Sequence, residues 1–296
     1  MRGEDPGRTV VDGVEVVGAL SPSRAGDFMT CPLLYRFRTV DRLPEPFSPD
    51  AVRGTVVHRV LEDLFDLPAA ERTPDRAADL LQPAWEAVLE ADPEIAEMFG
   101  AEGPEIGAWL ASCQDSLAGY FRLEDPTRLE PAERELYVET LLDSKLLLRG
   151  FIDRLDIAPT GQIRVVDYKT GRAPRLEFEA KALFQMKFYA LVLWRLRGTI
   201  PAMLQLIYLG NGEVLRYAPD ESDLLATERK VKALWSAIER AQQTGDWRPR
   251  RSALCGWCAH QALCPEFGGT PPPYPGWPAD GVLPDAGVET PLDRAE

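Results

Sequence analysis

Apolar residues in the first part of the chain recur every three or four positions, which is the spacing of one helix face. Residues 21–38 ("SPSRAGDFMTCPLLYRFR") predict a helix that begins after Ser21 or Ser23 as its N-cap. Residues 51–65 ("AVRGTVVHRVLEDLF") predict a second helix. Its buried face carries Val57, Val60, Leu61 and Leu64.

Residues 70–125 also favour helix and are acidic, with proline as the expected breaker. We expect interruptions at Pro83, Pro93 and Pro104. The pattern then changes to strands, and later to helices that alternate with strands. Strands are predicted for 135–142, 145–157 and 162–168, a helix for 177–196, a hairpin around Asn211-Gly212 for 202–218, and a helix for 221–242.

The strand "QIRVVDY" ends in the motif "VVDYKTG", which places an acid and a lysine two residues apart in an apolar run. A symmetric hairpin centred on Thr160 pairs residues whose numbers sum to 320, so Asp153 lies opposite Asp167 and Lys169 lies beside Asp167. Two carboxylates about 5 Å apart repel each other unless a cation lies between them. The hairpin therefore predicts a Mg²⁺ site, or else a structural charge cluster.

The register also predicts that Asp156 pairs with Arg164 on the opposite face of the hairpin. That pair is an ordinary cross-strand ion pair. Asp156 is therefore left out of the predicted site.

Three of the five cysteines lie close together, in "CGWCAHQALC". Cys255, Cys258 and Cys264 have the spacing C-x2-C-x5-C, which indicates metal binding. The fourth ligand is either His260 or Cys31, and the spacing allows zinc as well as an iron–sulfur cluster. The remaining Cys113 is predicted to be a buried thiol.

The formal net charge of the 296 residues is −14, which by itself argues against nucleic acid as a partner. The charge is uneven, however. Residues 66–135 hold 17 acids and 5 bases, a balance of −12, which we interpret as a solvated helical surface; residues 145–265 hold 19 bases and 12 acids, a balance of +7. No apolar run indicates a signal peptide or a membrane span, so we expect a cytoplasmic protein that does not contact a membrane.

The elements "GFIDR" and "DYKTG" together resemble the PD-(D/E)XK nuclease superfamily. The match is closest to its RecB-like branch, which includes the AddB nuclease domain and the CRISPR-adaptation nucleases, and covers most of residues 19–266. The resemblance implies an α/β fold with a restriction-endonuclease-like core, in which helices flank a central mixed sheet. We therefore expect one nuclease domain at 19–267, with an acidic helical insertion at 66–135.

The ends of the chain are expected to lie outside this domain. Residues 1–18 are predicted to be a flexible start. Residues 268–296 are rich in proline and glycine and are predicted to be a disordered tail.

The resemblance also implies roles for single residues. The helix "GTVVHRVLEDLF" resembles the histidine-containing helix of that branch, which makes His58 a metal ligand with Asp153 and Asp167; the alternative is a histidine of the core or of the helix surface. "QMKFY" resembles its Q-x-x-x-Y element and assigns supporting roles to Gln185 and Tyr189.

The cysteine pattern of the same branch implies that Cys31, Cys255, Cys258 and Cys264 hold a 4Fe-4S cluster, with structural zinc as the alternative and His260 as a bystander. The cluster at 255–264 would close onto Cys31. It would then act as a structural clamp between the two ends of the domain.

The implied activity is hydrolysis of DNA phosphodiester bonds by an exonuclease that depends on Mg²⁺ or Mn²⁺ and acts in DNA repair or recombination. His58, Asp153, Asp167 and the Tyr168 carbonyl would hold the metal, and Lys169 would orient or deprotonate a water and offset phosphate charge. The expected substrate is DNA that is single-stranded or has free ends. The alternative function is a non-catalytic iron–sulfur module that binds DNA.

The expected DNA contacts come from basic and aromatic residues. Basic candidates are Arg172, Arg175, Arg248, Arg250 and Arg251, although the last three fit a solvated surface equally well. Trp247 and Trp257 either stack on bases or pack around the cluster. No G-x-x-x-x-G-K-[ST] loop occurs, so an ATP-driven motor would come from a helicase partner.

Overall fold

The structure is a computed structural model that describes residues 10–11, 13–100, 103–173 and 179–276. Arg175, most of the predicted flexible start and the last 20 residues of the predicted tail lie outside these ranges. The chain divides into two compact units. Among the described residues, unit 1 comprises those up to 46, 139–150 and 222–276, and unit 2 comprises those within 47–138 and 151–221.

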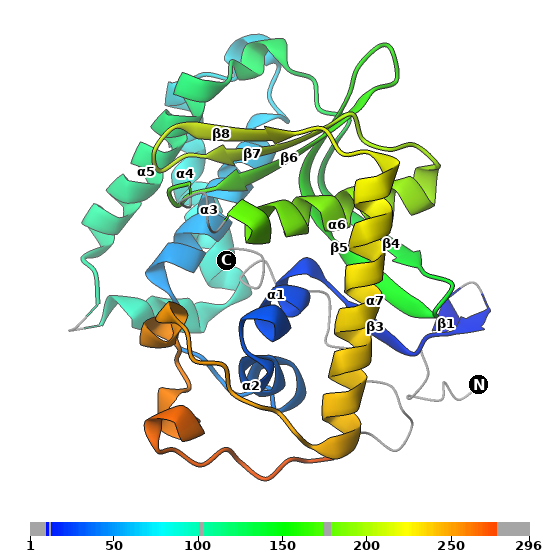
Figure 1. Ribbon diagram of the computed structural model, residues 1–296. Helices are drawn as coiled ribbons and strands as arrows, with labels where there is room; N and C mark the ends of the chain where they lie inside the picture. Colours follow the sequence, from blue (N-terminus) through cyan, green and yellow to red (C-terminus); the bar gives the residue numbers. More distant parts are fainter. Residues whose placement is uncertain (1–9, 12, 101–102, 174–178, 277–296) are drawn as a thin grey trace, which may run out of the picture. The chain divides into compact units, whose positions relative to one another are not determined.

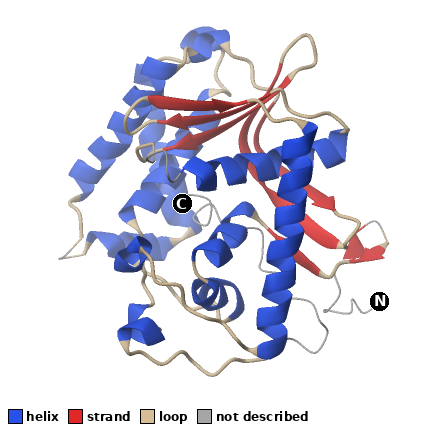
Figure 2. Cartoon of the chain, in the orientation of Figure 1, coloured by secondary structure: helices blue, strands red, loops and turns tan. Residues whose placement is uncertain are grey.

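A central mixed sheet carries the fold (Figures 1 and 2). Its strands follow the order β3-β5-β6-β7-β8, and β4 also pairs with β5. The pairs β5–β6 and β7–β8 are antiparallel, and β3–β5 and β6–β7 are parallel. The strand bounds are β3 Gly18–Leu20, β4 Glu133–Leu141, β5 Leu146–Ile157, β6 Ile163–Lys169, β7 Met203–Tyr208 and β8 Glu213–Tyr217.

The register of the β5–β6 hairpin agrees with the predicted sum of 320. Leu155 pairs with Val165 and Ile157 with Ile163. The paired positions end at Arg154–Val166, one position before Asp153 and Asp167. Asp156 and Arg164 form the predicted ion pair at 2.7 Å.

Helices cover both faces of the sheet in unit 2. One face packs on α3, α4 and α5 through Val166, Tyr168, Ile207 and Leu209, and these residues belong to one buried apolar cluster. Helix α6 packs against β6 and β7 (Figure 1). Alternation along these strands directs every second side chain away from that cluster. The helix bounds are α3 Pro49–Leu64, α4 Pro74–Ala91, α5 Ile106–Leu123 and α6 Glu179–Arg197, with short turns η2 Ala69–Glu71, η3 Pro93–Phe99 and η4 Pro126–Arg128.

Helix starts follow local capping chemistry, but one expected break does not occur. Ser48 and Thr73 accept backbone N–H bonds at the starts of α3 and α4, and a proline follows each cap. Pro83 lies inside α4, so the predicted interruption there is wrong. Leu81, Ala84 and Trp85 on either side of it are buried, and this packing outweighs the hydrogen bond that proline removes.

Unit 1 contains the first helices of the chain and the long helix α7 Glu221–Thr244. The predicted helix over 21–38 is divided. Helix α1 (Pro22–Thr30) begins at Ser21, whose side chain accepts the N–H of Arg24, and ends before Cys31. Cys31 is extended because Pro32 follows it and starts α2 (Pro32–Tyr35), which continues as the π-turn η1 (Arg36–Val40).

The ends of unit 1 also make defined contacts. The short strands β1 (Val10–Val11) and β2 (Val14–Glu15) pair with each other. Pro272 accepts a hydrogen bond from Arg36 at 2.6 Å, and the Tyr274 hydroxyl donates to the Gln242 carbonyl at 2.8 Å. Three short turns precede this segment, namely η6 Ala253–Trp257, η7 Gln261–Leu263 and η8 Pro265–Phe267.

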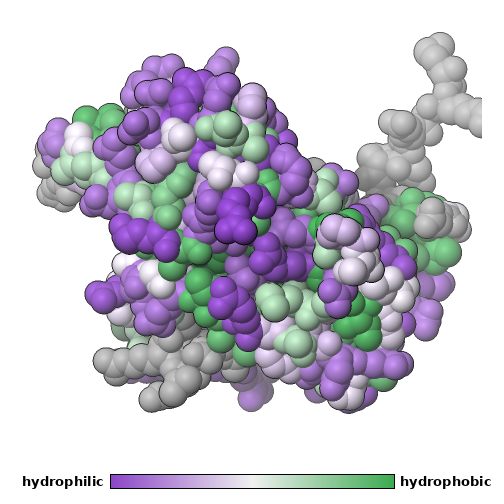
Figure 3. All heavy atoms as spheres, turned by 90° about the horizontal axis from the view of Figure 1, so that it is seen from above, coloured by the Kyte–Doolittle hydropathy of each residue, from purple (hydrophilic) through white to green (hydrophobic). Residues whose placement is uncertain are grey.

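Hydrophilic residues cover most of the face drawn in Figure 3, with apolar residues in scattered patches between them. In the described ranges, every helix is too short or too polar to cross a lipid bilayer.

Candidate active site

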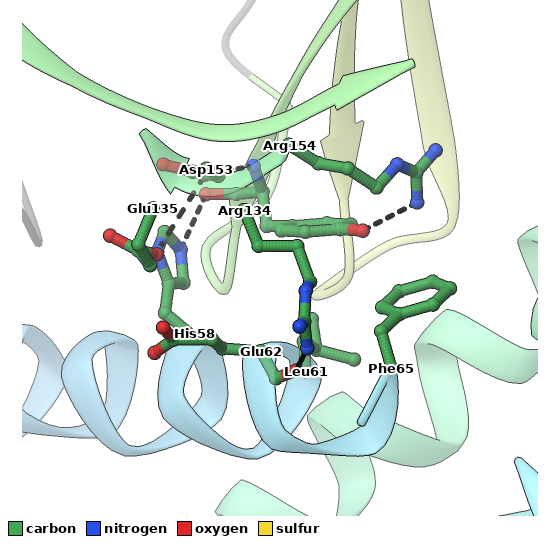
Figure 4. Close-up of a pocket in the computed structure, with 9 residues that line it drawn as sticks. His58, Leu61, Glu62, Phe65, Arg134, Glu135, Asp153 and Arg154 are labelled. Carbon is green, nitrogen blue, oxygen red and sulfur yellow. Dashed lines mark hydrogen bonds and ion pairs between the residues drawn. The ribbon is translucent and has the colours of Figure 1, made fainter. Parts of the chain in front are cut away.

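Three side chains from three elements of unit 2 converge beside the end of the β5–β6 hairpin. His58 comes from α3, Glu135 from β4 and Asp153 from β5. One ligand atom from each lies within 4.8 Å of the other two. Figure 4 shows His58 rising from its helix toward the two carboxylates, in a pocket that Arg134, Arg154 and Tyr168 also line.

The hydrogen bonds of His58 favour a cation at this point. Its Nε2–H donates to the Tyr168 carbonyl oxygen at 2.9 Å, so the neutral ring presents the Nδ1 lone pair on its other side. Nδ1 faces Asp153 Oδ2 at 3.6 Å and Glu135 Oε1 at 3.9 Å. Two carboxylates this close together beside the imidazole repel each other unless a positive charge lies among them. A histidine that donates its other N–H to a carbonyl is also a common arrangement in metal sites.

Asp153 is held by the main chain of the neighbouring strand. Its Oδ2 accepts the N–H of Tyr168 at 2.7 Å. Tyr168 therefore contacts both candidate ligands, Asp153 through its N–H and His58 through its carbonyl. The sequence reasoning found the carbonyl but not this second contact.

Asp167 and Lys169 lie on the same side of β6, as the alternation predicts. The Lys169 ammonium is 3.0 Å from Asp167 Oδ2. The side chain of Gln185, from α6, donates to Asp167 Oδ1 at 3.1 Å. Tyr189 is buried one helical turn after Gln185. The Gln185 side chain is thus hydrogen-bonded to Asp167, a predicted site residue.

Burial raises the pKa of Asp167 to about 6, although Lys169 and His58 act to lower it and Asp153 adds to the rise. Burial alone would lower the pKa of Lys169, but the Asp167 and Asp153 carboxylates raise it above its ordinary value. The site therefore favours a charged Lys169 and a carboxyl at Asp167 that takes up a proton more readily than usual.

Glu135 was missed by the sequence reasoning. Its backbone has a φ of +42°, a left-handed conformation that non-glycine residues seldom adopt. Strand alternation predicted the positions of Asp153, Asp167 and Lys169. It does not continue through a residue with a left-handed backbone. Strained backbone positions are often found at functional sites, and Glu135 lies beside the candidate ligands His58 and Asp153.

The cysteines with metal-binding spacing lie in unit 1. Burial raises the pKa of Cys258, and Glu45, Cys264 and Cys31 act in the same direction, so Cys31 and Cys264 lie near this thiol. The backbone N–H groups of Arg250 and Ser252 point at the sulfur atoms of Cys31 and Cys255, each at 3.3 Å. The contact between Arg250 and Cys31 brings the segment that precedes Cys255 next to Cys31.

His260 in unit 1 and Cys113 in unit 2 are both buried. The His260 Nε2 atom is 2.6 Å from Glu45 Oε1, and the His260 ring packs edge-on against Phe37. Cys113 is fully buried in α5, and burial raises its pKa to about 12.

The two tryptophans proposed for DNA stacking differ in exposure. Trp247 is 5% exposed and stacks on Tyr35, with ring centroids 5.9 Å apart. Trp257, in η6, is 82% exposed. Leu254 lies three residues earlier in the same turn and is also exposed, so the two share one face of the turn.

Comparisons with known proteins agree with this fold. A family model for the PD-(D/E)XK nuclease superfamily matches residues 19–265. Gene 69 protein of Mycobacterium phage D29 is 25% identical over 183 residues, which is 54% of this chain and 65% of the phage protein. One component of the ATP-dependent helicase/deoxyribonuclease of Streptococcus equi subsp. zooepidemicus is 30% identical over 131 residues, which is 43% of this chain and 12% of that component.

A solved structure shows the same fold. A candidate exonuclease from Eubacterium rectale superposes with a TM-score of 0.54 and 14% sequence identity, over 82% of this chain and 87% of that protein. The family match covers the helix with His58, the hairpin with Asp153 and Asp167, and the cysteine segment to residue 265. By this match, and by the mixed sheet that the structure shows, the chain belongs to the PD-(D/E)XK nuclease superfamily.

Proposed function

We propose that the protein is a metal-dependent DNA exonuclease of the RecB-like type, with its active site at the end of the β5–β6 hairpin. The observation that carries this proposal is the convergence of His58, Glu135 and Asp153, with Asp167 and Lys169 beside them. A DNA-binding fold without catalysis has no need for such an arrangement of mutually repelling groups.

The donor set, one imidazole and carboxylates, fits Mg²⁺ or Mn²⁺. His58, Glu135 and Asp153 would hold the ion, and Asp167 is the further carboxylate available to it. A bound divalent ion supplies a water of lowered pKa and a positive charge for the scissile phosphate.

Lys169 acts as a cation in this proposal. Its raised pKa keeps the ammonium charged between Asp167 and Asp153. A charged Lys169 orients the attacking water and offsets charge on the phosphate, and it cannot accept a proton. Gln185 holds Asp167 so that its second oxygen stays with Lys169.

The four cysteines Cys31, Cys255, Cys258 and Cys264 are proposed to hold a 4Fe-4S cluster, which would tie the start of unit 1 to its last segment. The same segment is proposed to contact DNA. Trp257 offers an exposed ring for base stacking, and Arg248, Arg250 and Arg251 precede it. Because Trp247 packs inside unit 1, we do not assign it to DNA.

A helicase is a candidate partner. The relative from Streptococcus equi is named as part of a helicase/deoxyribonuclease, and the matched region is 12% of that relative. A role in DNA repair or recombination is part of the proposal and is motivated by this relationship.

The decisive test compares the wild type with Lys169→Ala on end-labelled single-stranded DNA, with Mn²⁺, Mg²⁺ or EDTA. We expect the wild type to degrade the DNA, EDTA to block the reaction, and Lys169→Ala to lose activity by about two to four orders of magnitude. Lys232→Ala, which removes a surface lysine of α7, serves as the matched control.

The alternative function is a non-catalytic iron–sulfur module that binds DNA. It is favoured if the wild type and Lys169→Ala bind DNA equally and neither cleaves any DNA form. Duplex and single-stranded substrates, each with free or blocked ends, belong in the same assay.

A further inference from the structure

Arg154 follows the candidate ligand Asp153 in β5, and its guanidinium is almost completely buried, with 1% of the side chain exposed. Both terminal nitrogens bind the carboxylate of Glu124, at 2.7 and 3.0 Å. One of them also donates to the phenol oxygen of Tyr168 at 2.5 Å (Figure 4). The charge is thus matched by Glu124 at the end of α5, with Asp156 nearby at 3.2 Å.

This contact occurs where the hairpin loses its ordinary pairing. The paired positions of β5 and β6 end at Arg154–Val166. Beyond that point the strands are connected by side chains. Asp153 accepts the Tyr168 N–H on one side, and Arg154 donates to the Tyr168 hydroxyl on the other.

Tyr168 links Arg154 to two residues of the candidate site, Asp153 and His58. Its N–H orients Asp153 and its carbonyl orients His58, so the Tyr168 peptide units set the positions of two of the three converging groups. Its ring is buried between Arg154 and Tyr120, at 5.5 and 5.8 Å between centres. A displacement of the ring would therefore move groups that hold the ligands.

The network also extends along the same face of the sheet to β7 and β8. Gln205 of β7 donates to Glu124 at 3.2 Å and accepts from Arg216 of β8 at 3.1 Å. Four strands and the end of α5 are thereby connected by polar contacts, which are buried or partly buried except at the exposed Arg216. Buried networks of this kind hold one arrangement, because each member left without its partner is costly.

We propose that Arg154, held by Glu124, is a positioning residue for the metal site and acts through Tyr168. The inference rests on the proposed function, because it takes His58, Glu135 and Asp153 as metal ligands. Outer contacts of metal ligands typically change metal affinity by about 10- to 100-fold when removed.

The test measures Mn²⁺ affinity of the metal-free full-length chain by electron paramagnetic resonance titration, without DNA. Tyr168→Phe keeps the buried ring and removes the oxygen that Arg154 holds. Tyr35→Phe is the matched control, because it also removes a buried phenol oxygen, in unit 1. We expect Tyr168→Phe to weaken Mn²⁺ binding about 10-fold and Tyr35→Phe to leave it unchanged.

Glu124→Gln is the second variant, since it removes the charge that anchors Arg154 and keeps the size of the side chain. We expect it to weaken Mn²⁺ binding at least as much as Tyr168→Phe. Unchanged Mn²⁺ affinity in folded Tyr168→Phe and Glu124→Gln overturns the inference while leaving the proposed nuclease intact. If the wild type binds no Mn²⁺, the proposed metal site fails together with the inference.

Discussion

Asp167 keeps a carboxyl group in a nearly closed environment, with Lys169 and Gln185 as its partners. Its pKa in the folded protein is raised to about 6 from an ordinary value of 3.8, chiefly by burial. Between these two values the folded protein holds a proton that the unfolded chain has already lost. The contribution of Asp167 to the free energy of unfolding of the metal-free protein should therefore decrease as the pH rises through this window.

We predict that the infrared band of a protonated carboxyl appears in metal-free protein as the pH falls through about 6. The band should be missing in Asp167→Asn, and adding Mn²⁺ to the wild type should reduce it, because an ionised carboxylate is the form that meets a cation. A band that persists unchanged in Asp167→Asn would assign the titration to another carboxyl.

Glu135 shows where sequence reasoning stops at the residue scale. Asp153, Asp167 and Lys169 could be located because hairpin symmetry and strand alternation are regular. Glu135 lies in β4 with a left-handed φ, and its closeness to His58 depends on how three elements pack. Considering every carboxylate in the sequence near the candidate hairpin would have included Glu135.

For Glu135→Gln we expect Mn²⁺ binding about 10-fold or more weaker and a matching loss of nuclease activity, because the amide offers a poorer ligand than the carboxylate. The fold should be retained, since the size and the backbone conformation stay the same. Activity measured across a range of Mn²⁺ concentrations separates the two effects. Full activity at ordinary Mn²⁺ levels would remove Glu135 from the ligand set.

At the scale of elements, the end of α5 connects the helical part of unit 2 to the sheet. Gly119 of α5 lies against the main chain after β7, and a Cβ there would approach the Leu209 carbonyl oxygen to 2.6 Å. Backbone atoms cannot move aside as a flexible side chain does. Gly119 therefore permits close packing of α5, although glycine is a weak helix former.

Gly119→Ala should lower the free energy of unfolding by about 1–3 kcal/mol, because overpacking outweighs the gain in helix propensity. Gly107→Ala in the same helix is the control. Its Cβ would meet only the Glu105 carboxylate, at 3.2 Å, and that side chain can move. Urea unfolding of both variants gives the comparison, and equal stability of the two would show that α5 tolerates a shift from the sheet.

Most elements were predictable because each follows from local chemistry. The helix face with Val57, Val60, Leu61 and Leu64 is buried as expected, and Gly212 takes the positive φ that the β7–β8 turn requires. Two helices differ from the prediction, for different reasons. Helix α4 continues through Pro83, and α1 ends before Cys31. Tertiary packing decided the first, and a local proline effect that the helical pattern concealed decided the second.

At the scale of the molecule, the proposed cluster joins parts of unit 1 that are more than 200 residues apart in sequence. Cys31 lies between α1 and α2, and the other three cysteines follow α7. Ligation by all four would connect these segments only in the folded chain, so cluster binding and folding of unit 1 should be coupled.

We predict that anaerobically purified protein contains about four iron and four sulfide per chain and absorbs near 400 nm. Cys31→Ser and Cys258→Ser should lose the iron and melt at a lower temperature. Cys113→Ala should keep the iron, because that thiol is completely buried among the apolar residues of α5 in unit 2. One zinc per chain in place of iron would assign the cysteines to a zinc site, and iron retained in Cys31→Ser would point to a different fourth ligand.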